Sequence, residues 1–390
     1  MKDKHIGLII YGNPSRFPPL LNAIGILSKD FKVLLICRNI GNMDFLCPGG
    51  VILHCLGKNG SFRKKETQSV FRKIIEFLFF IIKACFLIRK YRCRLIYSFD
   101  MHGFVAGFFA SRIGRILPLV YHNLDLSRKR DLRMASFWVK IIELRIARFA
   151  DKAVFPNFKR AKLFKKMAKL QGFPWIVMNA PRRIEVLPEN NLLSLLQKNN
   201  FSLNSKVVLY QGSITADRFP LEVLESILSW PEDVILLLIG DYCVVNFKRT
   251  LKHKIKEYKL EQRVLHIPFV AYEHLFSLTV GAFLGLALFK GEDINLKFLV
   301  GASNKIFEYF ACGVPPLVLD CSDMRSLFDE SWVYFTKTCS PEDIAKVVNM
   351  VYSDPEGHKR KSQLCRRAHL EKFNFEIQFK PVIEYLQETV

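Results

Sequence analysis

The 390-residue sequence lacks the features that mark several specialised classes of protein. Its ten cysteines form no C-x-x-C pair and follow no recurrent spacing, which argues against a disulfide framework or a structural zinc site. It contains no segment of low complexity and no internal repeat with a period of roughly 20 to 50 residues. We therefore expect an ordinary globular protein, for which a reducing cytoplasm is the simplest location.

Long hydrophobic runs are also missing. The most apolar stretch, residues 74–88, is interrupted by Glu76 and Lys83 and is too short to span a bilayer. The first residues lead directly into an apolar run at 6–11, which we expect to be a first strand and not part of a signal peptide. Hydrophobic residues still make up 50% of the chain, which is enough for two buried cores.

Acidic residues are scarce relative to basic ones. Lys and Arg number 58 against 36 Asp and Glu, which gives a net charge of +22 and a pI of about 9.6. The excess is concentrated in residues 58–94, with eleven basic residues against two acidic ones, and in residues 126–170, with fourteen against three. Charge alone would permit nucleic acid as the partner. The basic residues are not interleaved with aromatic ones in a recognisable module, so we predict no nucleic-acid partner.

An anionic membrane surface is the macromolecular partner that we predict instead. Basic side chains flank the apolar residues 74–88, among them Arg72, Lys73, Arg89 and Lys90. A helix of this composition can rest on an anionic inner leaflet. The alternative is a helix that is buried in the protein core, and the sequence leaves both open.

Apolar runs typical of strands alternate with longer helical patterns through both halves of the chain. This alternation predicts an α/β protein in which βαβ units build two Rossmann-like domains with parallel sheets. The predicted strands are residues 6–11, 32–37, 51–55, 95–98, 118–121, 152–155, 206–211, 234–240, 263–267, 283–289, 315–319 and 333–335.

A polar stretch that contains Pro188 and Asn190 separates the two halves. We therefore predict an N-terminal domain at residues 1–185, a linker at 186–204 and a C-terminal domain at 205–372. The remaining residues, 373–390, have the apolar spacing of a C-terminal helix.

The most informative segment lies at residues 303–315 and reads S-N-K-I-F-E-Y-F-A-C-G-V-P. Ser303 or Asn304 can cap a short helix at its start. Gly313 would end this helix, with Pro315 just beyond it at the start of a buried strand. A loop, a helix start and a strand in this order are typical of the carboxyl edge at which parallel sheets bind ligands.

Lys305 and Glu308 share the face of this helix that is not apolar. A helix start favours a bound anion such as a diphosphate, and a cation beside it would add to that preference. The alternative is an ordinary surface ion pair between Lys305 and Glu308.

The run N-K-I-F-E-Y-F-A-C-G-V-P resembles the donor-site helix of GT-B glycosyltransferases, particularly those of glycosyltransferase family 4. In that family the glutamate that matches Glu308 binds the ribose hydroxyls of the nucleotide. The preceding residues lie against the diphosphate and the sugar, which implies this role for Asn304 and Lys305. Many members carry a second glutamate eight positions earlier, where this sequence has Val300.

The segment V-V-L-Y-Q-G-S-I at residues 207–214 resembles the first strand and glycine turn of the nucleotide-binding domain in the same family. Gly212 would allow the backbone to approach a ligand closely. Many members place an Arg directly after this glycine and a Lys five positions later, where this sequence has Ser213 and Arg218. The resemblance implies that Arg218 binds phosphate, and an exposed loop arginine is the alternative.

The candidates in the N-terminal half rest on fainter likenesses to the family. Gly12 follows the first strand, where the family has a glycine-bearing loop near the sugar. The segment L-V-Y-H-N-L-D-L-S places His122 at a strand end, where related transferases have a His that could hydrogen-bond the sugar or its acceptor. Asp125 is the neighbouring catalytic candidate, and His102 is a further alternative. A structural histidine is the competing interpretation of His122.

Together these resemblances imply a GT-B fold, with two parallel sheets that face a central cleft and a C-terminal helix that crosses back to the first domain. They imply a hexosyl- or related transferase that moves a sugar from a UDP- or GDP-sugar to a growing, lipid-linked glycan in surface polysaccharide synthesis. Family 4 enzymes retain the anomeric configuration and need no bound metal, so no metal and no cofactor beyond the donor is expected. A peripheral location on the cytoplasmic face of the membrane would suit such an acceptor.

Two other classes of function remain open from the sequence. A related GT-B enzyme such as a nucleotide-sugar 2-epimerase would turn over without any acceptor. A basic nucleic-acid-binding protein is less favoured, because it leaves the pattern at residues 304–315 unexplained.

Overall fold

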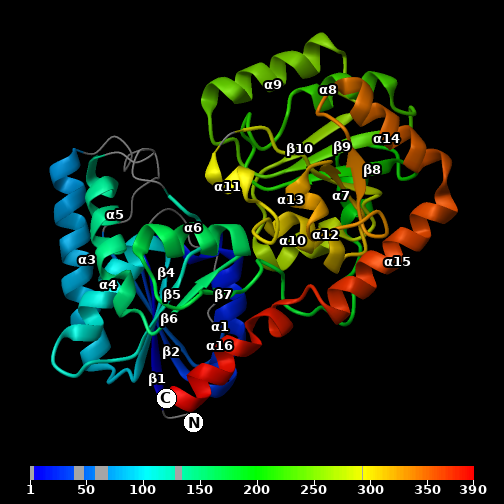
Figure 1. Ribbon diagram of the computed structural model, residues 1–390. Coiled ribbons are helices and arrows are strands. Elements are labelled where there is room, and N and C mark those ends of the chain that lie inside the picture. Colours follow the sequence, from blue (N-terminus) through cyan, green and yellow to red (C-terminus); the bar gives the residue numbers. More distant parts are fainter. Residues whose placement is uncertain (1–3, 39–47, 58–68, 128–133, 292) are drawn as a thin grey trace. The chain divides into compact units, whose positions relative to one another are not determined.

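The computed structural model describes residues 4–38, 48–57, 69–127, 134–291 and 293–390. The chain divides into two compact units (Figure 1). Unit 1 consists of Met1–Asn179 and Phe375–Val390, and unit 2 consists of Ala180–Asn374. Each unit is built on one sheet in which all paired strands are parallel.

The sheet of unit 1 has seven strands in the order β3-β2-β1-β4-β5-β6-β7. Its inner strands are apolar on both faces, as expected when helices cover both sides of a parallel sheet. The strands are β1 (His5–Ile10), β2 (Lys32–Arg38), β3 (Val51–Leu56), β4 (Leu95–Phe99), β5 (Leu119–His122), β6 (Lys152–Phe155) and β7 (Trp175–Ile176).

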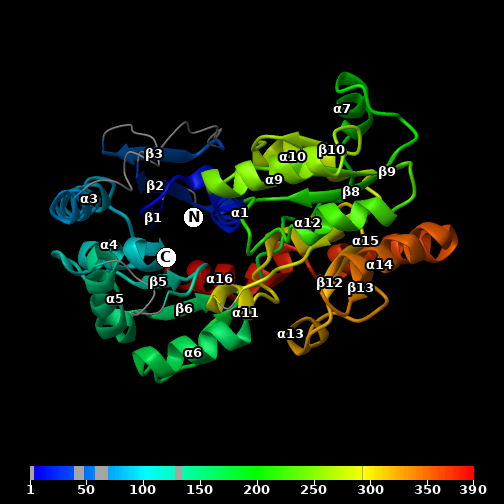
Figure 2. The ribbon, with the colours of Figure 1, turned by 90° about the horizontal axis from the view of Figure 1, so that it is seen from above.

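Helices cover both faces of this sheet. Ile6 and Leu8 of β1 belong to the same core as α1 and α16, whereas the alternate residue Gly7 faces Ile88 of α3. Helices α3, α4 and α5 lie side by side (Figures 1 and 2). The helices are α1 (Pro18–Asp30), α3 (Val70–Lys90), α4 (Asp100–Arg112), α5 (Met134–Ile146), α6 (Phe158–Ala168) and α16 (Phe375–Thr389), with short 3-10 turns η1 (Pro14–Arg16) and η3 (Ala147–Phe149).

The C-terminal helix α16 is part of the core of unit 1. Its apolar residues Phe375, Phe379, Val382 and Leu386 recur at helical spacing, and all four are fully buried against β1, β2, β4 and α1. The prediction that this helix returns to the first domain is therefore confirmed.

The sheet of unit 2 has six strands in the order β10-β9-β8-β11-β12-β13. One face packs on α8, α9 and α14 through a single large apolar core. The strands are β8 (Lys206–Gln211), β9 (Val234–Ile239), β10 (Val264–Ile267), β11 (Leu284–Ala287), β12 (Pro316–Leu319) and β13 (Tyr334–Thr336).

The helices of unit 2 include one in the region that we assigned to a linker. Residues 186–204 contain α7, which contacts α10, and unit 2 begins before them at Ala180. The helices are α7 (Leu192–Lys198), α8 (Glu222–Ser226), α9 (Val245–Glu257), α10 (Tyr272–Thr279), α11 (Ile294–Lys297), α12 (Asn304–Ala311), α13 (Ser322–Arg325), α14 (Pro341–Ser353) and α15 (Pro355–Glu371), with the 3-10 turn η4 (Ile227–Ser229).

Each sheet has one point at which the order of strand addition reverses. It lies between β1 and β4 in unit 1 and between β8 and β11 in unit 2. Open parallel sheets bind ligands beyond the carboxyl ends of the strands at such a switch point. The two switch points are therefore the expected ligand sites of the two sheets.

Every strand predicted from an apolar run is present, with ends that differ by at most two residues. Strand β7 was not predicted, because two residues give no detectable alternation or run. None of the helices in the described ranges combines the length and the apolar character needed to cross a membrane.

Candidate functional site

Helix α12 is fixed over the switch point of unit 2 by Tyr309. The Tyr309 hydroxyl lies 2.9 Å from the carbonyl oxygen of Leu209 in β8, to which it donates, and it accepts a hydrogen bond of 3.3 Å from the amide of Gln211. The Tyr309 ring lies on Gly285 of β11, where an added Cβ would come within 2.5 Å of the ring. Contact with both strands therefore locks this helix in place.

The predicted nucleotide anchor Glu308 is buried next to the end of β8. Its Oε2 accepts a hydrogen bond of 2.6 Å from Nε2 of Gln211, and Oε1 of Gln211 accepts one of 3.0 Å from Thr279. Burial raises the pKa of Glu308 to about 7, and the Gln211 hydrogen bond and the charge of Lys305 oppose this rise. Gln211 thus orients the Glu308 carboxylate at the carboxyl edge of the sheet.

Lys305 places its ammonium group between two aromatic rings. Nζ lies 3.7 Å from the ring centroid of Tyr210 and 5.0 Å from that of Phe289. No acceptor in the described part of the chain hydrogen-bonds Nζ, although the atom is buried. Burial lowers the pKa of Lys305 well below its usual value, and the nearby positive charge of Arg218 lowers it further.

The alternative of a surface ion pair between Lys305 and Glu308 is wrong. Glu308 is only 4% exposed, and the ammonium of Lys305 lies on Tyr210 and not on the carboxylate. The side of α12 that carries Lys305 and Glu308 packs against the end of β8, at the switch point of the sheet.

The loop after β8 completes this cluster. Gly212 has a φ of +117°, which favours glycine, and the place of an added Cβ lies 3.7 Å from Cε of Lys305. Gly240 follows β9 with a φ of +146°, and a Cβ there would collide with the Gly212 carbonyl oxygen. Arg218 is exposed in the same loop, close enough to perturb Lys305. Two cations therefore gather near the start of α12.

The loop before α12, and not a side-chain cap, holds the start of this helix. Ser303 occupies the N-cap position, as predicted, but its side chain makes no capping hydrogen bond. The buried Oδ1 of Asn304 likewise lacks a hydrogen-bond partner among the residues described. The preceding loop is held by Asp323, whose Oδ2 accepts hydrogen bonds from the amides of Leu299 (3.2 Å) and Val300 (3.0 Å).

Tyr309, Gln211 and Asp323 were missed as site residues by the sequence analysis. Gln211 carried a usable signal, because a polar residue at the last position of a buried strand lies at the carboxyl edge of the sheet. Tyr309 was assigned no role, and Asp323 lies 20 residues beyond Ser303 with no motif around it.

In unit 1, Gly12 follows β1 at the other switch point. It is buried, and an added Cβ would lie 2.9 Å from the ring of Phe17. The following turn is closed by Asn13, whose Oδ1 accepts hydrogen bonds from the amide and the hydroxyl of Ser15. Gly12 therefore belongs to a tightly packed turn at the carboxyl edge.

His122 is enclosed at the end of β5 and has no exposed surface. Its Nδ1 forms a hydrogen bond of 2.9 Å with the Tyr97 hydroxyl, and its ring stacks on Phe99 with centroids 5.1 Å apart. Burial lowers the pKa of His122 to about 3, so the ring is neutral at physiological pH. These surroundings are those of a core histidine, and its catalytic role stays a prediction.

Asp125 is exposed, unlike His122. Its Oδ1 lies 3.8 Å from Nη1 of Arg160, which also donates a hydrogen bond of 2.7 Å to the Leu124 carbonyl oxygen. The amides of Leu124 and Asp125 in turn donate to Oδ1 of Asp100 at the end of β4. The alternative candidate His102 stacks on Tyr11 with centroids 5.4 Å apart, and burial lowers its pKa to about 4.

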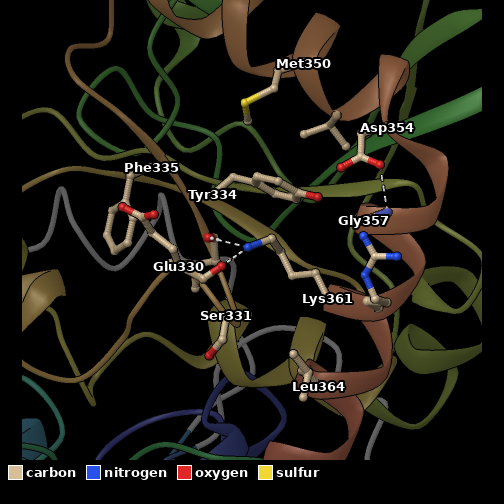
Figure 3. Close-up of a pocket in the computed structure, with 12 residues that line it drawn as sticks. Glu330, Ser331, Tyr334, Phe335, Met350, Asp354, Gly357, Lys361 and Leu364 are labelled. Carbon is tan, nitrogen blue, oxygen red and sulfur yellow. Dashed lines mark hydrogen bonds between the residues drawn. The ribbon is translucent and has the colours of Figure 1, made fainter.

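A cavity of about 620 Å³ lies elsewhere in unit 2, between β13 and the helices α14 and α15 (Figure 3). Polar groups that line it form hydrogen bonds within the protein. Nζ of Lys361 donates to the carbonyl oxygens of Glu330 and Val333 beside the edge strand, and Asp354 accepts a hydrogen bond from the Gly357 amide. None of its lining residues belongs to the α12 cluster.

No group of three or more His, Cys, Asp or Glu side chains suited to a metal ion occurs within the described ranges. The cations near α12 are the groups suited to an anion. The basic residues that the sequence analysis noted at 58–68 and 128–133 lie outside the described residues.

Comparisons with known proteins identify the fold. The sequence matches no protein-family model and no curated protein. The structure is similar to that of HepE from Anabaena in complex with UDP and glucose, with 17% identity, a TM-score of 0.74 and coverage of 99% of this chain and 100% of that one. It is also similar to WaaG, a glycosyltransferase involved in lipopolysaccharide biosynthesis (14% identity, TM-score 0.67, coverage 96% and 98%).

A third similar structure is that of a protein from Listeria monocytogenes assigned as a UDP-N-acetylglucosamine 2-epimerase (11% identity, TM-score 0.62, coverage 100% and 96%). At these identities the likeness establishes the fold alone, which is that of the GT-B glycosyltransferases. The predicted fold class is therefore confirmed.

Proposed function

We propose that this protein is a glycosyltransferase that moves a sugar from a nucleotide-sugar donor to a growing glycan. The observation that carries the proposal is the polar cluster of α12 at the switch point of unit 2, where Glu308 and Lys305 meet the end of β8. Parallel sheets of this kind bind nucleotides at such a point. The GT-B neighbours, one of them in complex with UDP and glucose, support the same use of the fold.

Each residue of the cluster has a proposed part in binding the donor. Lys305, Arg218 and the free amides at the start of α12 bind the diphosphate, and Gly212 lets it approach the backbone. Glu308, oriented by Gln211, accepts hydrogen bonds from the ribose hydroxyls. The mutual repulsion of two cations that lack an intervening anion is relieved when the diphosphate binds.

The chemical step needs stabilisation of the leaving group. The bond between C1 of the sugar and the phosphate oxygen breaks, and its electron pair remains on the diphosphate. The oxygen of an acceptor hydroxyl forms the new bond to C1, and the proton of this hydroxyl passes to the diphosphate. Preorganised cations at the diphosphate stabilise this developing charge without a metal ion. We propose, from the family resemblance, that the transfer retains the anomeric configuration and that the donor is a UDP- or GDP-sugar.

We further propose that unit 1 rests on an anionic membrane and takes a lipid-linked acceptor. Helix α3 supports this, because it buries one face and exposes a stripe of large apolar side chains at helical spacing. Phe71 is 73% exposed and Ile82 is 66% exposed. The stripe consists of Phe71, Ile75, Leu78, Ile82 and Phe86. The expectation of a buried core helix thus applies to only one side of α3.

The apolar surface extends beyond α3. On the adjacent helix α5, Met134 is 67% exposed and Trp138 is 57% exposed. An apolar patch of this size in a soluble domain marks an interaction surface. Basic residues at both ends of α3 and in unit 1 as a whole favour an anionic lipid surface over a neutral partner.

The donor proposal is tested by thermal unfolding in the presence of a panel of UDP-, GDP- and ADP-sugars. A ligand that binds only the folded protein at about 100 times its Kd stabilises it by about 2.7 kcal/mol. Glu308→Ala should abolish the shift while the fold remains intact, and Glu273→Ala on the exposed face of α10 is the matched control. No response of the wild type to any donor would contradict the proposal.

The membrane proposal is tested by flotation with vesicles of phosphatidylcholine, with and without phosphatidylglycerol. We expect binding only with the anionic lipid, and a loss of binding when Phe71, Ile82 and Phe86 are all changed to Ser. Val186→Ser with Leu228→Ser removes exposed apolar side chains from unit 2 and is the control. Equal binding of both variants would overturn this part of the proposal.

The two other classes of function predict different results. A nucleotide-sugar 2-epimerase converts its substrate without an acceptor, which is measured by incubating the protein with UDP-N-acetylglucosamine alone. A nucleic-acid-binding protein associates with DNA or RNA with a strong dependence on salt. Release of nucleoside diphosphate that requires a glycan acceptor would support the transferase over both.

A further inference from the structure

We infer that Asp100 forms a binding site for a neutral sugar hydroxyl of the acceptor at the switch point of unit 1. The inference rests on the proposed glycosyltransferase function and names a specificity-determining residue for it. Asp100 follows β4 directly and is the first residue of α4, so it lies where the sheet of unit 1 would bind a ligand.

Asp100 has a left-handed backbone at an unusual place in the chain. Five non-glycine residues in the described ranges have a positive φ, and Asp100 is one of them at +55°. The other four follow the C-terminal ends of helices, where a left-handed residue is a normal cap: Arg92, Lys169, Asn200 and Lys259. Asp100 instead stands between a strand and the start of a helix. Strain of this kind persists where a side chain has to be aimed at a site.

The carboxylate of Asp100 is anchored through one oxygen only. Its Oδ1 accepts hydrogen bonds from the amides of Leu124 (2.8 Å) and Asp125 (3.3 Å). No residue in the described ranges donates a hydrogen bond to Oδ2. One oxygen therefore fixes the orientation of the group, and the other remains as an acceptor for a ligand.

The charges around Asp100 define what this ligand can be. Burial raises the pKa of Asp100 to about 7, the negative charge of Asp125 raises it further, the two amides lower it, and Glu143 adds a smaller rise. No cation among the described residues lowers the pKa of Asp100. Lys140 pairs with Glu143 at 2.6 Å, and Arg160 donates to the Leu124 carbonyl oxygen. Asp125 and Glu143 would repel an anionic group at Oδ2, whereas a neutral hydroxyl can donate to this oxygen.

Besides Asp125, whose negative charge acts on Asp100, the ionisable groups at this edge include two histidines and a tyrosine. Burial keeps His102 of α4 and His122 of β5 neutral at physiological pH by lowering their pKa values. Burial also raises the pKa of Tyr121, which donates its hydrogen bond to Glu143. Asp100 is thus the group whose ionisation should control binding near pH 7.

The test is the Asp100→Asn variant, measured with an array of neutral and acidic mono- and oligosaccharides. Asn tolerates a left-handed backbone nearly as well as Asp, and its amide oxygen can still accept from Leu124 and Asp125, so the variant should fold. Asp151→Asn is the matched control, because Oδ2 of Asp151 also accepts a backbone hydrogen bond, from Leu119, but at the opposite edge of the sheet.

We expect the wild type and Asp151→Asn to bind at least one neutral glycan, and Asp100→Asn to bind it about ten- to a hundredfold more weakly. Wild-type binding should weaken as the pH falls below about 7, and binding by Asp100→Asn should not depend on pH in this range. Unchanged binding by Asp100→Asn, or the absence of neutral-glycan binding by the wild type, would overturn the inference. Thermal stabilisation by nucleotide sugars tests the proposed function separately, because it depends on unit 2.

Discussion

Replacing Lys305 with Met should make the protein more stable and unable to bind its donor. Nζ of Lys305 is buried on Tyr210, and no hydrogen-bond acceptor among the described residues contacts it. A buried donor without a partner costs about 1–3 kcal/mol, and the attraction to the ring returns about 0.5–2 kcal/mol. Met is unbranched like Lys, is one atom shorter, carries no charge and packs well on aromatic rings. We therefore expect a net gain of about 1 kcal/mol.

This gain should depend on pH in a defined direction. Burial lowers the pKa of Lys305 well below its usual value, whereas in the unfolded chain it is about 10.4. Between these two values the unfolded chain binds more protons at this position, so the stability of the wild type rises with pH. The advantage of Lys305→Met should accordingly shrink as the pH approaches about 10.4.

Urea unfolding of the full chain across this pH range measures the effect, and calorimetric titration with the donor measures binding. A gain of about 1 kcal/mol corresponds to about 2–4 °C in the melting temperature of a unit of this size. Lys248→Met is the control, because Nζ of Lys248 also faces a ring, that of Tyr242, but is exposed. The control should change stability by less than about 0.5 kcal/mol. A destabilised Lys305→Met variant that binds the donor normally would refute the reasoning.

Three further predictions concern the helices that build the two units. Burial raises the pKa of Glu308 to about 7, above the value of about 4.3 in an unfolded chain. The stability of the wild type should therefore fall as the pH rises between these two values, and urea unfolding should show no such fall for Glu308→Gln. Gly285→Ala should cost about 1–3 kcal/mol in urea unfolding and weaken donor binding, because its Cβ would strike Tyr309. Phe379→Ala should destabilise unit 1 by about 3–5 kcal/mol, which hydrogen exchange resolved by unit can measure, and it should leave donor binding unchanged.

Much of the fold could be predicted from the sequence, because parallel strands that are buried on both faces have continuous apolar sequences. The runs at β8 and β9 gave their strands to within one residue, and the apolar spacing of α16 indicated its buried face. Strand β7 could not be predicted, because its two residues are paired only through the neighbouring strand β6. Helix α7 was hidden in a stretch whose polar residues are typical of a linker.

The site was predicted less completely than the fold. The motif gave Lys305 and Glu308, but helical periodicity alone left a ligand-binding face and a surface ion pair both open, since it carries no information on which neighbour a polar face meets. The burial of Lys305 depends on Tyr210 and Phe289, which are distant in sequence. The strain at Asp100 is likewise set by tertiary contacts, because an Asp after a strand is compatible with many backbone conformations.

The return of α16 to unit 1 has a consequence for how the chain is made. A ribosome that has finished β7 still has about 200 residues to add before α16 emerges, which takes roughly 10–40 s at typical rates of synthesis. During that time unit 1 lacks Phe375, Phe379, Val382 and Leu386, and the apolar side chains that they cover stay accessible. Unit 2 is continuous in sequence and is complete first. Most of unit 1 is therefore synthesised before unit 2 but can complete its core only after it, and its uncovered apolar surface is accessible to chaperones until then.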